Sequence, residues 1–157
     1  MHLHNNLISH SYIDHGKKEG AKVEIGGGRH GDKGYFIEPT IFSGVSEDMK
    51  IMQEEIFGPV CSIAKFTDEA DAIRIGNNTT YGLASAVHTS NLNTAIRVSN
   101  QLRAGTVWVN QYNMLHHALP FGGYKESGIG RELGEAALAN YTQTKTVSIR
   151  LGDALFG

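Results

Sequence analysis

Short apolar, β-branched runs alternate with amphipathic stretches through the middle of this chain, and that alternation restricts the fold more than any other feature. Strands are predicted at residues 60–66, 83–89 and 106–110, and the stretches between them, 67–75 and 90–102, have helical periodicity. Each helical stretch opens with residues that cap helices, and a glycine follows each one closely. Such units form right-handed crossovers between parallel strands. The predicted fold class is therefore α/β, a parallel sheet with flanking helices.

Further elements are predicted on both sides of this centre. Pro39 lies inside an extended run and indicates an edge strand or a bulge, because proline cannot donate to a sheet ladder. Residues 111–130 have no strong period, and loops of that length are usually functional. The face of 90–102 expected to be buried consists of Leu92, Ala95, Ile96, Ser99 and Leu102. The other predictions are helices at 9–19 and 133–141 and strands at 22–25, 35–42 and 144–151.

Length and charge limit the classes of partner. A chain of 157 residues is expected to form one domain around one core. The formal net charge is -2 and no basic run exceeds Lys17-Lys18, so the positive stripe that nucleic-acid backbones require is missing. No apolar run approaches the roughly 18 residues of a membrane span, and the first residues lack a signal-peptide pattern. We therefore expect a cytoplasmic protein with no nucleic-acid and no membrane partner.

The single cysteine and the paired histidines could suggest nucleophilic or metal chemistry. Cys61 lies in an apolar run without a neighbouring histidine or lysine to activate the thiol, so we expect it to be buried and inert. His116 and His117 are adjacent, and adjacent side chains on an extended segment point apart. Neither this pair nor His2 with His4 has the spacing of a structural zinc site, so no metal site is predicted.

Four short motifs combine glycine with aromatic and charged residues. They span residues 53–60 (QEEIFGPV), 105–110 (GTVWVN), 120–128 (PFGGYKESG) and 130–134 (GRELG). Their composition and order resemble the C-terminal part of the NAD(P)-dependent aldehyde dehydrogenases, and the general likeness favours the fungal-like, broad-specificity branch of that family. The resemblance extends from about Tyr12 to Leu151.

The resemblance implies three parts: a poorly matching segment at 1–11, the C-terminal part of the catalytic domain at 12–141, and an oligomerisation strand and tail at 142–157. The family's nucleophilic cysteine, general-base glutamate and dinucleotide-binding domain are expected upstream of Met1. The chain is thus expected to be a fragment of an enzyme that oxidises aldehydes to carboxylic acids, with NAD as cofactor and NADP as the alternative. It would hold no catalytic residue and be inactive alone. The alternative function is a non-catalytic interaction or oligomerisation module derived from that fold.

Residue roles also follow from the resemblance. Glu55 matches the glutamate that binds the nicotinamide-side ribose, and Phe57 matches the ring that packs beside the nicotinamide. Phe121, Leu115 and Asn113 match positions along the tunnel through which the aldehyde enters. These five residues are the predicted cofactor and substrate contacts.

Without the resemblance, the same residues have simpler interpretations. Glu54 and Glu55 would be a solvated surface pair, because charged residues are rarely buried unless paired. Phe57 would be an ordinary core aromatic. The resemblance further implies a homo-oligomer assembled through Thr144–Leu151, whose alternating pattern gives a strand with one polar face.

Overall fold

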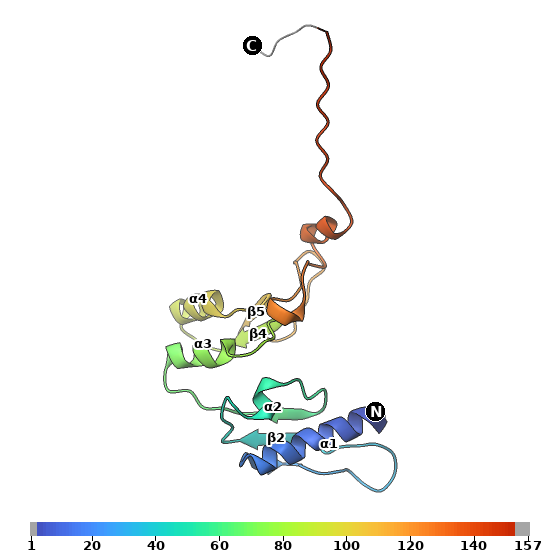
Figure 1. Ribbon diagram of the computed structural model, residues 1–157. Coiled ribbons are helices and arrows are strands. Elements are labelled where there is room, and N and C mark those ends of the chain that lie inside the picture. The colour runs from blue at the N-terminus through green and yellow to red at the C-terminus, as the bar shows by residue number, and fades with distance from the viewer. Residues whose placement is uncertain (1–2, 153–157) are drawn as a thin grey trace.

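The computed structural model describes residues 3–152, which form two small bodies followed by an extended segment that runs away from them (Figure 1). The N-terminal body, residues 3–63, contains α1 (Leu3–Lys18), β1 (Lys22–Ile25), β2 (Thr40–Ser43), α2 (Lys50–Gln53) and β3 (Val60–Ser62). The second body, residues 64–140, contains α3 (Glu69–Asn77), β4 (Ala84–Val87), α4 (Leu92–Gln101), β5 (Thr106–Val109) and the 3-10 helices η1 (Lys125–Ser127) and η2 (Glu135–Asn140).

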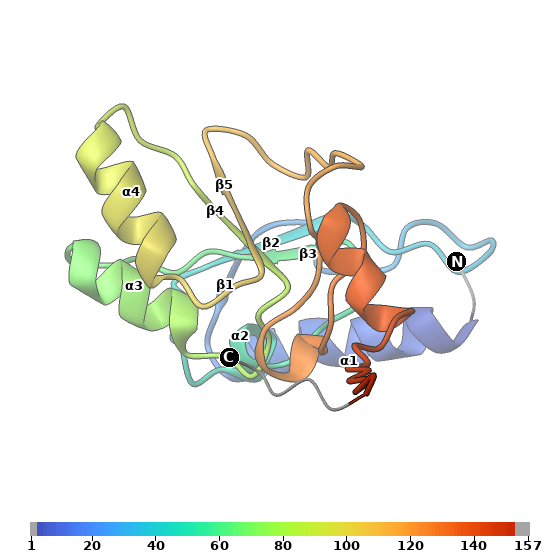
Figure 2. The same ribbon diagram turned by 90° about the horizontal axis from the view of Figure 1, so that it is seen from above.

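Each body has its own sheet. In the N-terminal body the strand order is β1-β2-β3, with β1 antiparallel to β2 and β2 parallel to β3. In the second body β4 and β5 pair in parallel, from Ala84 opposite Thr106 to Val87 opposite Val109. Helices α3 and α4 lie side by side next to this pair (Figure 2). The α/β class with parallel pairing is confirmed, and the antiparallel β1 makes the first sheet mixed.

The core of the N-terminal body lies between its helices and one face of its sheet. Phe42 and Ile13 are fully buried there, and α1 comes so close that a Cβ on Gly16 would lie 3.1 Å from the Phe42 ring and 3.0 Å from Ile51. The other members of the buried apolar cluster are Ala21, Ile37, Val45 and Ile56. Ile56 belongs to the 53–60 motif, so this core also fixes one residue of the candidate cofactor loop.

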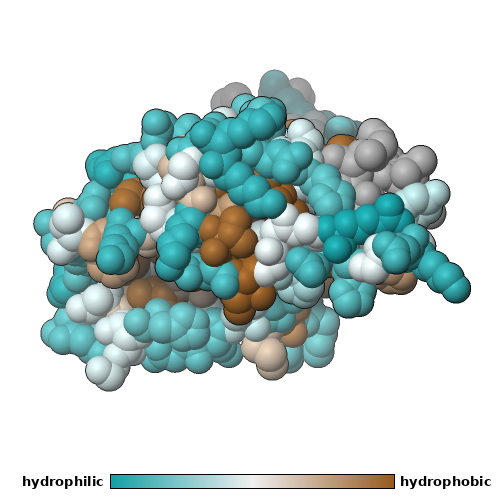
Figure 3. All heavy atoms as spheres, turned by 90° about the horizontal axis from the view of Figure 1, so that it is seen from below, coloured by the Kyte–Doolittle hydropathy of each residue, from teal (hydrophilic) through white to brown (hydrophobic). Residues whose placement is uncertain are grey.

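Cys61 is exposed, so the expectation that it is buried was wrong. Thr40 and Phe42 of β2 face the helices, whereas Ile41 and its register partner Cys61 face the opposite side of the sheet. Ile25, the register partner of Ile41 on β1, is 58% exposed on that side. Seen from below the view of Figure 1, the surface is largely hydrophilic, with some apolar side chains gathered in its middle (Figure 3).

The caps of the two central helices were predicted from local chemistry and are present. Asp68 accepts a hydrogen bond from the Asp71 amide, and Asn91 accepts one from the Thr94 amide. The predicted buried face of α4 was wrong in part: Ala95 is buried as predicted, but Leu92 and Ile96 are 73% and 50% exposed, and Val98 is buried instead. Packing of α4 against β4 and β5 selects the face, and the apolar pattern allowed more than one choice.

Other elements differ from the prediction in their limits. The first helix begins at Leu3 instead of residue 9, the strand expected at 35–42 starts only after Pro39, and the helix expected at 133–141 is the 3-10 helix η2. Residues 144–151 are exposed and pair with no strand in the described part of the chain, so their role as an oligomerisation strand stays a prediction. Between residues 3 and 152, no helix combines the length and apolarity that crossing a membrane requires.

Close backbone contacts fix the second body. The Gly105 amide donates to the Gly82 carbonyl at 3.0 Å, and the Tyr124 amide donates to the same carbonyl at 2.8 Å. A Cβ on Gly105 would lie 1.6 Å from the carbonyl oxygen of Gly122. Only glycine fits at this crossing between the second and third motifs.

We expect Gly105→Ala to lower the free energy of unfolding by about 3 kcal/mol or more, because the added methyl group meets backbone that cannot move independently. Urea denaturation followed by Trp108 fluorescence measures the change. Gly28→Ala is the matched control, since its Cβ would meet only the Glu38 carboxylate at 3.5 Å. Equal midpoints for the two variants would contradict the proposed crossing.

Candidate functional site

The 53–60 motif forms the loop between α2 and β3, and its side chains alternate in direction. Ile56 is buried in the core, whereas Glu55 and Phe57 on either side of it are exposed, Phe57 by 70%. Phe57 has a φ of 55°, which is uncommon for a bulky residue. Within residues 3–152, Phe57 is therefore not the core aromatic of the simpler interpretation. No hydrogen bond or ion pair engages the Glu55 carboxylate within residues 3–152.

Glu54 has a different environment from Glu55. Its Oε2 accepts a hydrogen bond from the Tyr12 hydroxyl of α1 at 2.8 Å, and the Lys50 ammonium lies 3.7 Å away. The hydrogen bond to Glu54 raises the pKa of the Tyr12 phenol above its ordinary 10.0, with smaller contributions from burial and from the Glu54 charge. The two adjacent carboxylates, treated as one surface pair from sequence alone, therefore have separate surroundings.

A cleft of about 450 Å³ brings the first motif to the third. Residues 52–55 form one side, and Tyr81, Leu83, Glu126 and Ser127 form the other. The cleft lies where the two bodies meet, so its width depends on how they are joined.

Lys125 and Ser127 fasten the third motif to the end of α3. The Lys125 ammonium donates to the carbonyls of Asn77 at 3.2 Å and Thr79 at 2.7 Å, and the Ser127 hydroxyl accepts from the Gly82 amide at 2.9 Å. A lysine near carbonyls at a helix C-terminus is favourable because those oxygens have no helical partner. Sequence reasoning missed this role, since nothing local links Lys125 to residues almost fifty positions earlier.

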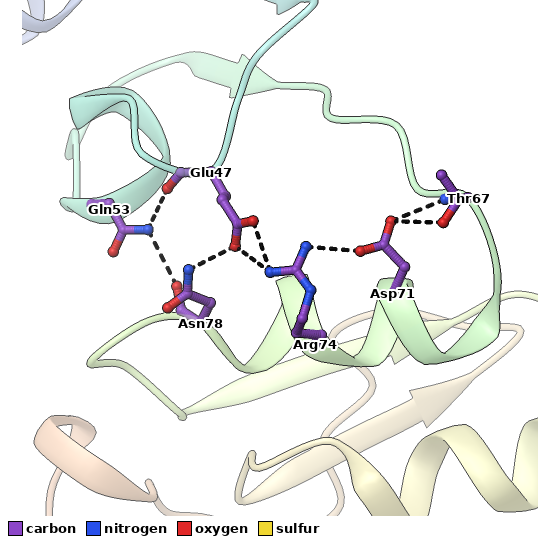
Figure 4. A network of polar contacts seen from close by, with 6 residues as sticks. All are labelled: Glu47, Gln53, Thr67, Asp71, Arg74 and Asn78. Carbon is purple, nitrogen blue, oxygen red and sulfur yellow. Dashed lines mark hydrogen bonds and ion pairs between the residues drawn. The ribbon is translucent and has the colours of Figure 1, made fainter.

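The bodies are joined by polar contacts around Glu47, which lies in the turn before α2 (Figure 4). Arg74 Nη1 donates to both Glu47 oxygens, at 2.7 and 2.8 Å, and its Nη2 donates to Asp71 at 2.8 Å. Asn78 donates to Glu47 Oε2 at 2.7 Å. The Gln53 amide donates to the Glu47 carbonyl and, at 3.3 Å, to the Asn78 carbonyl. We call these contacts the Glu47 clamp.

A second cleft, of about 200 Å³, holds two of the three predicted tunnel residues. Leu115 and Phe121 line it together with residues of β5 and the following loop: Thr106, Val107, Trp108, Gln111, Met114, His116, Leu119 and Pro120. Asn113 is exposed, has a φ of 56° and is not among the lining residues. The two clefts share no residue, so Glu55 and Phe121 do not meet in one site within the described chain.

Trp108 orders the loop that forms this second cleft. Its indole Nε1 donates to the Met114 carbonyl at 2.9 Å, and its ring makes an edge contact with Tyr112 at 5.5 Å between centroids. His116 and His117 do not point apart as predicted: their rings stack at 4.3 Å, because residues 116–119 form a turn closed by a hydrogen bond from the Leu119 amide to the His116 carbonyl. Within residues 3–152, no three potential metal ligands come together.

Comparisons of the sequence and the structure with known proteins identify the family. Residues 6–147 match the model of the aldehyde dehydrogenase family. The chain belongs to the aldehyde dehydrogenase family. It is 80% identical to an aldehyde dehydrogenase of Alternaria alternata over 146 residues, 93% of this chain and 29% of that protein. It is 70% identical to one of Emericella nidulans over 145 residues, again 29% of the relative. The resemblance to fungal members is thereby confirmed.

Solved aldehyde dehydrogenase structures share the fold. The chain matches the NAD+ complex of the Bacillus cereus enzyme with a TM-score of 0.90 and 51% identity, over 93% of this chain and 30% of that one. It matches betaine aldehyde dehydrogenase of Staphylococcus aureus with a TM-score of 0.90 and 38% identity, over 99% and 33% of the two chains. The chain thus spans about 30% of the length of these relatives. They favour the aldehyde dehydrogenase interpretation over the non-catalytic module.

The Glu47 clamp predicts that the stability of this chain depends on pH. Hydrogen bonds from Arg74, and then Asn78, hold the pKa of Glu47 below its ordinary 4.5. Because the pKa of Glu47 is lower in the folded chain than in the unfolded one, the ionised carboxylate stabilises the fold above pH 4.5. This stability is lost as the pH falls through the lowered pKa. We expect Glu47→Gln to reduce Tm at neutral pH by a small amount, on the order of 2 °C because the pair is partly exposed.

Thermal unfolding between about pH 7 and pH 3 measures this effect, and the gap between parent and variant should close at the acid end. Glu135→Gln is the matched control, since Glu135 makes no hydrogen bond or ion pair through its side chain in the described part of the chain. A gap that stays constant down to pH 3 would show that Glu47 ionisation does not support the clamp.

Proposed function

We propose that this chain forms part of an enzyme that oxidises aldehydes to carboxylic acids with NAD, and with NADP as the alternative acceptor. The observation that carries the proposal is the outward presentation of Glu55 and Phe57 by a loop whose intervening residue, Ile56, is anchored in the core. The 51% identical Bacillus cereus relative is known as an NAD+ complex. Both findings support a dinucleotide as the ligand of this loop.

The chemical character of the loop fits the nicotinamide end of the cofactor. A carboxylate that makes no hydrogen bond or ion pair within the described chain can accept hydrogen bonds from both hydroxyls of a ribose. The exposed ring of Phe57 offers an apolar face beside it. The dinucleotide, when bound, supplies the acceptor for hydride. Glu55 and Phe57 would bind and orient it, while the nucleophile and the general base would come from other segments of the protein.

The second cleft supports a role in substrate entry. Leu115 and Phe121 provide apolar surface along it, and the Trp108 hydrogen bond to Met114 holds its wall. We assign Leu115, Phe121 and the nearby Asn113 to the tunnel that guides the aldehyde. A cytoplasmic location and a homo-oligomer assembled through Thr144–Leu151 complete the proposal.

Glu55→Gln is expected to lower the rate of hydride transfer by roughly tenfold or more, while the Kd for NAD changes much less. The amide keeps only part of the hydrogen bonding to the ribose, so the cofactor binds with its reacting carbon misplaced. The experiment uses a chimera in which residues 6–147 of this chain replace the matching part of the Alternaria alternata relative. Pre-steady-state absorbance measures hydride transfer, and fluorescence titration measures NAD binding.

Glu69→Gln is the matched control, since it makes the same chemical change in the Arg97 ion pair between α3 and α4. The control should retain the hydride-transfer rate of the parent chimera. If Glu55→Gln also retains it, the assignment of Glu55 to the ribose is wrong.

We expect the chain to self-associate and a version ending at Tyr141 to lose this property. Val147, Ile149 and Leu151 are 68%, 71% and 82% exposed, on a segment whose backbone pairs with no strand among residues 3–152. Burying each is worth roughly 1.5–3 kcal/mol. Light scattering at micromolar concentration compares the parent chain with the truncated chain and with the double variant Val147→Asn/Ile149→Asn, which keeps all 157 residues. A monomeric parent, or association unaffected by both changes, would sink the proposal.

A further inference from the structure

Helix α1 holds the candidate cofactor loop at both ends. At the first end, the Tyr12 hydroxyl donates to Glu54 Oε2 at 2.8 Å, and Lys50 lies over the Tyr12 ring with its ammonium 5.3 Å from the centroid. At the other end, Ser9 is fully buried against Gly58, where an added Cβ would lie 2.3 Å from the Ser9 hydroxyl oxygen. Ser9 and Tyr12 are three residues apart and therefore share one face of the helix.

The loop between these two contacts is backbone-strained. Phe57 has a φ of 55° and an exposed side chain, a combination that costs on the order of 1–3 kcal/mol and persists only when the surroundings fix it. The Phe57 side chain is 70% exposed, so packing of its own ring does not account for this conformation. Its neighbours are fixed instead: Glu54 by the Tyr12 hydroxyl, Ile56 by the core, and Gly58 by its close approach to Ser9.

We propose that Tyr12 is a positioning residue for the cofactor site: its hydrogen bond to Glu54, together with the Ser9–Gly58 contact, sets the direction of Glu55 and Phe57. The expected effect of Tyr12 on hydride transfer rests on the proposed function, whereas its effect on the conformation of the loop does not. Within residues 3–152 no hydrogen bond joins Tyr12 to Glu55 or Phe57, so Tyr12 acts on them through Glu54 and the loop backbone. Loss of the hydroxyl should leave the loop attached by Gln53, Ile56 and Gly58 but more mobile between Gln53 and Ile56.

The first measurement uses the 157-residue chain without cofactor. Tyr12→Phe removes only the hydroxyl and keeps the ring that packs against the core. We expect lower NMR order parameters for the backbone amides of Glu55 and Phe57, with the amides of α4 unchanged. Glu54→Gln should give a similar change, and the double variant should add little to it, because both changes break one hydrogen bond. Unchanged order parameters in Tyr12→Phe, or fully additive effects, would overturn the positioning role.

The second measurement uses the Alternaria alternata chimera. Tyr12→Phe is expected to lower the hydride-transfer rate by roughly tenfold, with a smaller change in NAD affinity, because small displacements of a reacting pair are heavily penalised. Glu69→Gln again serves as the control for general loss of stability and should not change the rate. A rate loss in Tyr12→Phe that merely follows its loss of Tm, and that Glu69→Gln reproduces, would mean a structural role only.

The two proposals can fail separately. If Tyr12→Phe loosens the loop but Glu55→Gln leaves hydride transfer unchanged, the loop is positioned by Tyr12 and the ribose assignment is wrong. If Glu55→Gln slows hydride transfer but Tyr12→Phe leaves both the loop and the rate unchanged, the ribose assignment stands and the positioning role is wrong.

Discussion

The Glu47 carboxylate is the point on which the arrangement of the two bodies depends. Neither body is large, and the cleft with Glu55 has one wall from each, so a change in their relative position would change the site. A single exposed ion pair contributes little to stability. Glu47, however, receives hydrogen bonds from Arg74 and Asn78 at once, and its backbone carbonyl receives one from Gln53 (Figure 4). A connected set of this kind fixes geometry better than its separate pairs would.

Gln53 connects this clamp to the cofactor loop. It is the last residue of α2 and the first residue of the 53–60 motif. Its bond to the Asn78 carbonyl holds the start of the loop against the second body, and its bond to the Glu47 carbonyl ties it to the turn before α2. Tyr12 then holds Glu54, and Ser9 abuts Gly58. Three separate parts of the chain therefore hold the loop: the C-cap of α3, helix α1, and the core around Ile56. Glu55 and Phe57 remain as the residues available to a ligand.

The sequence was sufficient for features decided by neighbouring residues. The Asp68 and Asn91 caps could be predicted because a cap involves only the next three residues. The exposure of Cys61 could not be predicted, since it depends on which side of the sheet the helices cover. The motifs pointed to Glu55 and Phe57 as candidates, but the contacts that hold their loop, from Tyr12 to Glu54 and from Gln53 to Asn78, join residues distant in sequence. A local sequence pattern does not indicate which distant residues will pair.

Backbone strain links the four motifs in a way that their composition did not reveal. Each contains one non-glycine residue in the left-handed region: Phe57, Asn110, Lys125 and Leu133, with φ between 53° and 61°. Such residues cost on the order of 1–3 kcal/mol unless glycine replaces them, and they cluster at functional segments. The constraints that hold them are specific. Asn110 exchanges two hydrogen bonds of 2.9 Å with the Thr89 backbone, and Lys125 binds two carbonyls at the end of α3.

These constraints explain why the motif residues are not interchangeable with glycine. A glycine would adopt the same φ more easily, but it would remove the amide of Asn110, the ammonium of Lys125 and the ring of Phe57. In the first two cases the side chain itself makes the contacts that hold the strained backbone. In Phe57 the side chain faces solvent and the support comes from α1 and the core instead. Phe57 thus differs from Asn110 and Lys125, because its strained backbone is held by its neighbours and its ring stays exposed, as the proposed contact with a ligand would require.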